Sequence, residues 1–220
     1  MNWEIIFEYR NIFLQGALTT LKITAIAILI GSILGLFLGL ARMSKSRWLR
    51  VPAYIYVDFI RGTPLLVQIM IIHAALIPSI FGHSLGAMIS GVVALSLNSA
   101  AYIAEIFRGG IQSIDRGQME AARSLGLNHS QAMKFVILPQ AFRRILPPLG
   151  NEFIALLKDS SLLMSISVAE LMMAGKVVSG SYMVTWEAYL PVAALYLIMT
   201  LVLSQVVQYM ERRLVTEKLS

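Results

Sequence analysis

The feature that most constrains this chain is a stretch of 43 residues, Gly62–Ala104, without a single Asp, Glu, Lys or Arg. A membrane-spanning helix needs about 20 predominantly apolar residues, so the stretch is long enough for two of them. Pro78, Gly82 and Gly86 place turn-forming residues near its middle. The stretch predicts two spans, at roughly 62–80 and 86–107, and therefore an integral membrane protein.

The composition supports this class. Of the 220 residues, 57% are apolar and only 14% are charged, whereas a soluble domain averages about 25% charged residues. Two further uncharged runs predict a first span at 17–41 and a last span at 188–210. A fifth span, at 145–171, contains Glu152, Lys158 and Asp159, which we expect to face protein or water rather than lipid. The sequence predicts an all-α integral membrane protein with five transmembrane helices, in which residues 1–220 form one transmembrane domain.

The distribution of basic residues predicts the topology. Thirteen of the 18 Lys and Arg residues fall in the segments 42–51, 108–144 and 211–220, against two in the loops of the other side. Basic residues concentrate in cytoplasmic loops, so we expect the N-terminus outside and the C-terminus in the cytoplasm. The net charge of +6 is then a sign of topology, and no nucleic-acid partner is expected.

Small residues recur on one face of the first predicted span. Gly31, Gly35 and Gly39 are four residues apart, which predicts a stripe where another helix approaches closely. Glycines tolerated on a lipid-facing surface are the alternative.

The long segment 108–144 has the pattern of two short helices. Gln118–Leu125 suits a helix, and Gly126 stands where a C-terminal glycine belongs. Asn128 begins a capping-box pattern, so a second helix is predicted over His129–Leu138, with Pro139 ending or redirecting it. An amphipathic helix pair without a partner remains the alternative.

The same segment carries a family pattern. Glu120-Ala121-Ala122, Gly126 and Val136-Ile137-Leu138-Pro139 fit EAA-x3-G-x9-I-x-L-P, with Val136 as the only departure. The pattern resembles the EAA motif of ABC importer permeases. Further segments resemble the polar amino-acid uptake subfamily, namely Arg61–Gln68, Asn98–Ser113 and Leu146–Leu162, and the resemblance extends over residues 10–210.

The resemblance implies a type I ABC importer permease in the bacterial cytoplasmic (inner) membrane. Its coupling residues would be Glu120, Ala121, Ala122, Gly126, Leu138 and Pro139, which would fit a groove in a separate ATPase subunit. The implied partners are two ABC ATPase subunits, a second permease subunit (identical or related), an extracytoplasmic amino-acid-binding protein and the lipid bilayer. ATP and Mg would belong to the ATPase subunits, and we expect no cofactor on this chain. The sequence has no G-x-x-x-x-G-K-[ST] loop, no clustered metal ligands and no apparent catalytic set, so a transport subunit is expected rather than an enzyme.

Polar residues inside the predicted spans are candidates for the translocation path. Asn98 and Tyr102 share one helical face, as do Glu152 and Asp159. Amides, hydroxyls and carboxylates can replace water around the two charges of an amino acid. The predicted path set is Gln68, Asn98, Tyr102, Glu152, Asp159, Ser160 and Ser161, and its acidic pair favours a basic amino acid. Hydrogen bonding and ion pairing between helices are the alternative role.

Two other functions predict different sequence features. An ion-coupled secondary transporter predicts repeated halves with matching broken helices, and the sequence shows no such repeat. A membrane-embedded enzyme predicts convergent catalytic groups. The sequence favours a permease subunit of an ATP-driven uptake system for polar amino acids.

Overall fold

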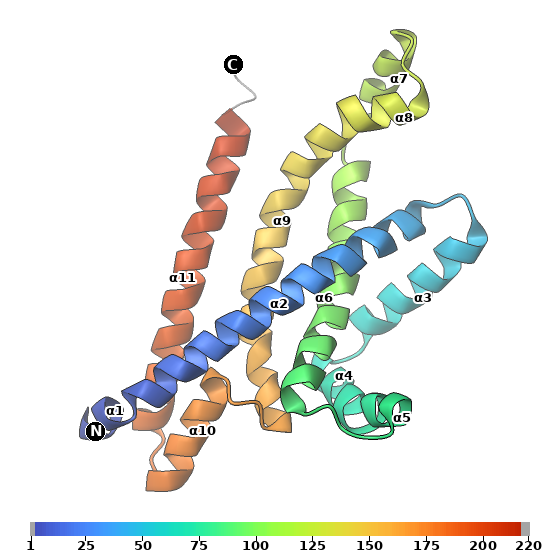
Figure 1. The fold of residues 1–220 in the computed structure, drawn as a ribbon. Helices are drawn as coiled ribbons and strands as arrows, with labels where there is room; N and C mark the ends of the chain where they lie inside the picture. The colour runs from blue at the N-terminus through green and yellow to red at the C-terminus, as the bar shows by residue number, and fades with distance from the viewer. Residues whose placement is uncertain (1–2, 217–220) are drawn as a thin grey trace.

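The structure, a computed structural model, describes residues 3–216, with side chains as far as residue 213. Every regular element in this range is helical (Figure 1). In chain order the elements are α1 (Trp3–Glu8), α2 (Arg10–Met43), α3 (Arg47–Gly62), α4 (Leu65–Ile71), η1 (Ile72–Leu76), α5 (Ile77–Phe81), α6 (Ala87–Gln112), α7 (Arg116–Ser124), α8 (His129–Ala132), η2 (Met133–Ile137), α9 (Leu138–Asp159), η3 (Ser160–Ile166), α10 (Leu171–Tyr182) and α11 (Trp186–Thr216). Of these, η1 and η2 are π-helical and η3 is a 3₁₀ helix.

Three helices are long and apolar enough to cross a membrane: Arg10–Met43, Ala87–Gln112 and Trp186–Arg213. Two bent pairs meet the same test together. They are Arg47–Gly62 with Leu65–Phe81, bent by 110°, and His129–Ile166 with Leu171–Tyr182, bent by 47°. Counting each bent pair as one span gives at most five spans among the described residues, by length and composition.

The second predicted span, 62–80, differs most from its prediction. Residues 47–62 form a helix of their own, and the chain breaks at Thr63 before α4 begins. Thr63 is extended (φ −119°, ψ 148°), as expected of a residue that precedes a proline. The helix before the break was not visible as an apolar run because charged residues, Arg61 among them, interrupt it.

The helix is continuous across Pro139. The predicted alternative that this proline ends the helix is therefore wrong. One helix runs from His129 to Ile166. The π-helical turn Met133–Ile137 comes directly before the proline. A proline removes one backbone donor and clashes with the carbonyl four residues back, and a wider π turn is a recognised way to accommodate such a fault. Helix α8 and the predicted span 145–171 are therefore parts of one continuous helix.

The glycine stripe on α2 packs against α6, which confirms the predicted close approach. All three glycines of the stripe are buried. A Cβ on Gly35 would lie 2.8 Å from the Cβ of Ile103, and one on Gly39 would lie 2.9 Å from the carbonyl oxygen of Ala104. These distances leave no room for a side chain, so the alternative of lipid-facing glycines is excluded.

Gly35→Val is expected to lower the free energy of unfolding by about 2 kcal/mol, because the added methyl groups would force α2 away from α6. Gly109→Val in α6 is the matched control, since nothing lies within 4 Å of a Cβ at Gly109. Thermal unfolding in detergent measures both. Equal unfolding midpoints for the two variants would contradict the tight contact.

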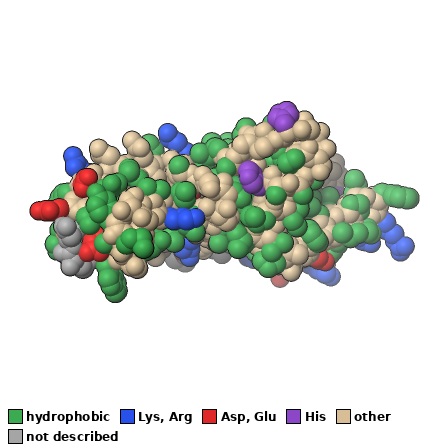
Figure 2. Space-filling model, turned by 90° about the horizontal axis from the view of Figure 1, so that it is seen from below, with side chains coloured by type: hydrophobic (Ala, Val, Ile, Leu, Met, Phe, Trp, Pro, Cys, Tyr) green, Lys and Arg blue, Asp and Glu red, His purple; other side chains and the backbone are tan. Residues whose placement is uncertain are grey.

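The two ends of the molecule differ in what they carry (Figure 1). The α7–α8 unit lies at the end where α11 finishes, whereas α1, α10, α4 and α5 lie toward the opposite end. Figure 2 shows the molecule from that opposite end, where hydrophobic side chains are widespread and charged ones are scattered among them. The largest buried cluster ties α2, α4, α6 and η3 together, with Ile23, Ile69, Leu95 and Leu163 among its members.

Candidate functional site

The α7–α8 unit is built by local hydrogen bonds. The Asp115 carboxylate accepts from the backbone N–H of Gly117 at 2.6 Å and caps α7. At the other end of α7, the N–H of Leu127 donates to the carbonyl of Ala122 and the N–H of Gly126 donates to that of Arg123, the two bonds of a Schellman motif. Gly126 has φ +88°, which confirms its predicted role as the C-terminal glycine.

The predicted capping box at the start of α8 is confirmed. The Asn128 side chain accepts from the N–H of Gln131 at 2.9 Å, and the Gln131 side chain accepts from the N–H of Asn128 at 2.9 Å. Two helix ends are thus fixed within a connection of four residues, 125–128. The unit has a defined shape even though it projects from the rest of the molecule (Figure 1).

The predicted coupling residues present an exposed surface. Glu120, Ala121 and Gly126 are exposed, Leu125 is 84% exposed, and only Ala122 is buried against the unit itself. Leu138 and Pro139 are also exposed, at the start of α9. No ion pair among the described residues involves Glu120. An exposed leucine next to small side chains and a carboxylate forms a surface against which a partner protein can pack closely.

Two of the predicted path residues form a buried amide pair at the α3–α4 break. The Gln68 amide nitrogen donates to the carbonyls of Ile60 (2.7 Å) and Thr63 (3.0 Å) and to the Thr63 hydroxyl (2.9 Å). Asn98 on α6 donates to the Gln68 oxygen at 2.9 Å. The pair satisfies carbonyls that the broken helix leaves free, and it fixes the 110° bend. These contacts are the hydrogen-bonding alternative that the sequence left open.

Three other predicted path residues come together on a less buried surface. Tyr102 is 37% exposed, and the Arg61 guanidinium lies 5.3 Å from the centre of its ring. Glu152 on α9 is half-buried and interacts electrostatically with Asp159 and with Arg61. Residues from α3, α6 and α9 therefore contribute to this region: Arg61 stacks on Tyr102 and interacts electrostatically with Glu152. Sequence reasoning missed Arg61 because it lies just outside the uncharged stretch.

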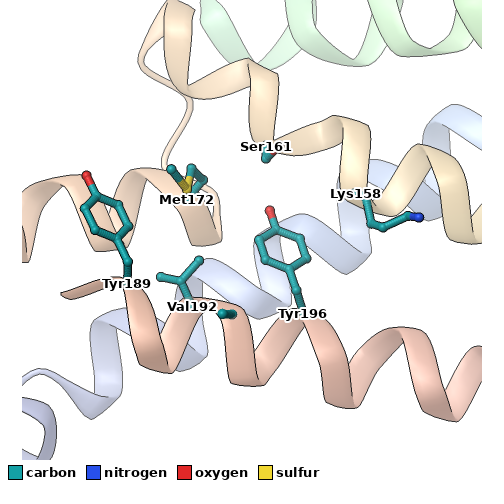
Figure 3. A pocket seen from close by; sticks show the side chains of 7 residues that line it. Lys158, Ser161, Met172, Tyr189, Val192 and Tyr196 are labelled. Carbon is teal, nitrogen blue, oxygen red and sulfur yellow. The ribbon is translucent and has the colours of Figure 1, made fainter. Parts of the chain in front are cut away.

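The two serines follow Asp159 in the chain and have partners of their own. The Ser160 hydroxyl is fully buried and donates to the carbonyl of Leu157 in its own helix at 2.7 Å. Ser161 lines a cavity of about 460 Å³ between α9–η3, α10 and α11. Figure 3 shows the Tyr196 hydroxyl pointing toward Ser161 in this cavity, and Lys158 extending away from both. The predicted set of seven path residues thus divides among three places.

A cluster of charges joins α2, α3 and α6. The Glu105 carboxylate lies 2.9 Å from the guanidinium of Arg42, 2.8 Å from that of Arg108 and 3.8 Å from that of Arg61. The Arg42 side chain is only 7% exposed and stacks over the ring of Tyr54 at 4.0 Å. Neither Arg42 nor Arg61 was predicted as a site residue from the sequence. The available signal for this cluster was that charged residues bound the uncharged stretch at both ends.

Glu170 is a buried carboxylate without a sequence prediction. It accepts from the N–H groups of Met172 (2.8 Å) and Met173 (2.7 Å), which caps α10, and from the Tyr196 hydroxyl (2.9 Å). With three donors on a side chain of a fully buried residue, Glu170 links α10 to α11 and needs no ligand.

The comparison with protein families decides the identity of this fold. The sequence model of the family described as "Binding-protein-dependent transport system inner membrane component" matches residues 12–216. The chain belongs to this family. Its members are permease subunits of ABC importers, so the chain is a multi-pass membrane component that moves substrate and has no ATPase site of its own.

Relatives of this permease match almost their whole length. It is 40% identical over 214 residues to the probable glutamine ABC transporter permease protein GlnM of Bacillus subtilis (strain 168), covering 97% of this chain and 98% of the relative. It is 39% identical over 213 residues to the glutamine transport system permease protein GlnP of Escherichia coli (strain K12), covering 97% of each chain.

Solved structures of transporters agree with the fold of the permease. A chain from the crystal structure of an amino acid ABC transporter with histidines superposes with a TM-score of 0.92 at 43% identity, covering 97% of this chain and 99% of that one. A chain of the inward-facing MetNI methionine ABC transporter gives a TM-score of 0.78 at 22% identity, covering 92% and 96%, and shows the shared fold alone. The type I importer fold expected from the sequence is thereby confirmed.

Proposed function

We propose that this permease forms the translocation path of an ATP-driven importer of polar amino acids, with glutamine as the first substrate to test. The observation that carries the proposal is the match of 97% of the chain to permeases whose names specify glutamine. The finer expectation of a basic substrate has less support. Arg61 interacts electrostatically with Glu152 and offsets part of the negative charge that favoured a cation.

The proposed partners follow from the exposed surfaces. Two ATPase subunits would each receive one α7–α8 unit and would hold ATP and Mg themselves. A second permease chain, identical or related, would complete the path around a two-fold axis, because one chain with at most five spans is too small to enclose it. A binding protein would deliver the amino acid from outside, and the C-terminus would lie in the cytoplasm. The exposure of Glu120 and Leu125 supports the coupling surface.

Within the path, we assign different tasks to the candidate residues. Tyr102, Glu152 and Asp159, with Arg61 added, would contact the amino acid in passage, because they are the accessible polar groups that the structure brings together. Gln68 and Asn98 would shape the path by fixing the α3–α4 bend. Ser160 and Ser161 would act through the packing of η3.

The experiment is uptake of radiolabelled glutamine into proteoliposomes that contain the permease, its ATPase subunit and internal ATP, with the binding protein added outside. We expect uptake only when all components are present, and unlabelled polar amino acids should compete. Uptake without the ATPase, driven by an ion gradient, would support the alternative of a secondary transporter and overturn the proposal.

Glu152→Gln is expected to lower the rate of glutamine uptake about tenfold, because the substrate ammonium would lose its charged partner. The matched control is Asp58→Asn, which removes an exposed carboxylate on α3 (69% exposed) outside the proposed path. ATP hydrolysis stimulated by the binding protein should persist in both variants. Equal uptake by the two variants would argue against a substrate contact at Glu152.

A further inference from the structure

One face of α3 is apolar and uncovered. Trp48, Ile55 and Phe59 are 90%, 65% and 60% exposed. They are seven and four residues apart, so they form a stripe along one side of the helix. The buried face of α3 lies elsewhere, at Ala53, Val57 and Ile60.

An apolar groove continues this stripe. Between α3, α4–η1 and α6 lies a cavity of about 260 Å³ whose exposed lining is apolar. Phe59 belongs both to the stripe and to the lining, and Val67 and Ile71 line the opposite side of the groove. A hydrocarbon chain that followed the stripe would therefore enter the groove without crossing a polar surface.

Basic residues stand at the start of the same helix. Lys45 and Arg47 are exposed and Arg50 is partly exposed, and no ion pair among the described residues involves any of them. These residues were expected in a loop over 42–51, but the α2–α3 connection is only Ser44–Ser46, so Arg47 and Arg50 are held on the helix. Arg50 lies seven residues before Val57, on the buried face, so two exposed cations, Lys45 and Arg47, remain at the end where the apolar stripe begins.

We propose that the α2–α3 turn and α3 bind one anionic phospholipid. The headgroup phosphate lies against Lys45 and Arg47, and an acyl chain follows the stripe (Trp48, Ile55 and Phe59) into the groove. The lengths agree. Trp48 to Phe59 spans about 17 Å of helix at 1.5 Å per residue, and the hydrocarbon of one leaflet is about 15 Å thick.

The charge pattern selects a lipid over a second protein chain. A protein surface that covered this face would need an apolar stripe and separate acidic groups in the same register. A phospholipid with a net negative headgroup carries both features in one molecule. Basic residues next to a membrane attract anionic lipids, and Trp at this level is typical of the interface between hydrocarbon and headgroups.

Trp48 provides the test. Trp3→Phe and Trp186→Phe leave it as the only tryptophan, since the chain has three. The full-length variant is reconstituted in phosphatidylcholine vesicles, and brominated phosphatidylglycerol or brominated phosphatidylcholine is titrated in. We expect quenching of Trp48 to give a relative binding constant about fivefold higher for phosphatidylglycerol, and we expect high salt to reduce this preference.

Two sets of variants locate the headgroup. Lys45→Gln and Arg47→Gln together should bring the preference to about one. The matched control removes the same charge from the α7–α8 end of the chain, with Arg116→Gln and Arg123→Gln, and should keep the preference. A preference lost equally in both sets would mean a diffuse field rather than a site, and would overturn the proposal.

A separate pair of variants tests the groove. Val67→Phe with Ile71→Phe should fill it and lower quenching by brominated phosphatidylglycerol at least twofold, without changing the unfolding midpoint of the chain. Equal quenching of wild-type Trp48 by the two lipids would overturn the proposal. Absence of quenching by either lipid would also overturn it, because the face would then be covered by protein, such as a second copy of this chain.

Discussion

Glu105→Gln is expected to lower the free energy of unfolding by about 3 kcal/mol. The carboxylate is the shared partner of three arginines, and two of them lie within 2.9 Å of it. Arg42 is 7% exposed, and its Nε makes no hydrogen bond, so the loss of Glu105 leaves a buried cation poorly compensated. Breaking a buried pair in this way typically costs about 3–5 kcal/mol, and the 17% exposure of Glu105 argues for the lower figure.

Chemical or thermal unfolding of the detergent-solubilised permease measures this effect. Asp58→Asn is the control. Asp58 also faces Arg42, but at 3.7 Å and with 69% of its side chain exposed, and the expected loss is below about 0.5 kcal/mol. Adding Arg42→Gln to Glu105→Gln should recover part of the stability, because no buried charge is then left unpaired. A Glu105→Gln variant as stable as Asp58→Asn would refute the role of the cluster.

Gly126→Val is expected to abolish uptake while the chain still inserts and folds. Gly126 has φ +88°, which a β-branched residue adopts only with strain, yet nothing lies within 4 Å of its Cβ position. The effect would therefore come from backbone conformation alone. Without the left-handed turn, α7 and α8 change their relative direction, and the exposed surface no longer fits the ATPase groove.

Uptake and co-purification with the ATPase subunit measure the coupling. We expect a loss of at least about tenfold in uptake, since a strain of roughly 1–2 kcal/mol or more would disfavour the turn. Gly126→Asn is the matched control, because asparagine tolerates a left-handed conformation, and it should keep most of the activity. Equal loss in both variants would show that bulk at this position matters rather than the turn.

The parts of the fold that depend on near neighbours could be predicted from the sequence. The Gly126 turn and the Asn128 capping box are decided by residues at most five positions away, and both are confirmed. The glycine stripe of α2 was predictable because a row of residues without side chains is typical of a surface where another helix packs closely. In these cases, the residues that determine the structure lie close together in the sequence.

The parts that depend on distant partners could not be predicted. Gln68 and Asn98 were predicted for the path by their polarity, but whether an amide faces a substrate or a broken helix depends on a bend that Thr63 introduces. Arg61 and Glu105 lie 44 positions apart in the sequence, and no spacing rule relates them. Glu170 acts as a helix cap, for which glutamate is an uncommon choice, so capping rules did not find it.

The uninterrupted helix from His129 to Ile166 has a mechanical consequence. Pro139, near the proposed coupling surface, and Asp159, in the proposed path, lie on this one helix about 30 Å apart at 1.5 Å per residue. A tilt of roughly 5° about the proline would displace the far carboxylate by about 2.6 Å, close to the length of a hydrogen bond. The helix would then pivot at the membrane surface. A small rotation at the ATPase would be enough to make or break a contact with the substrate.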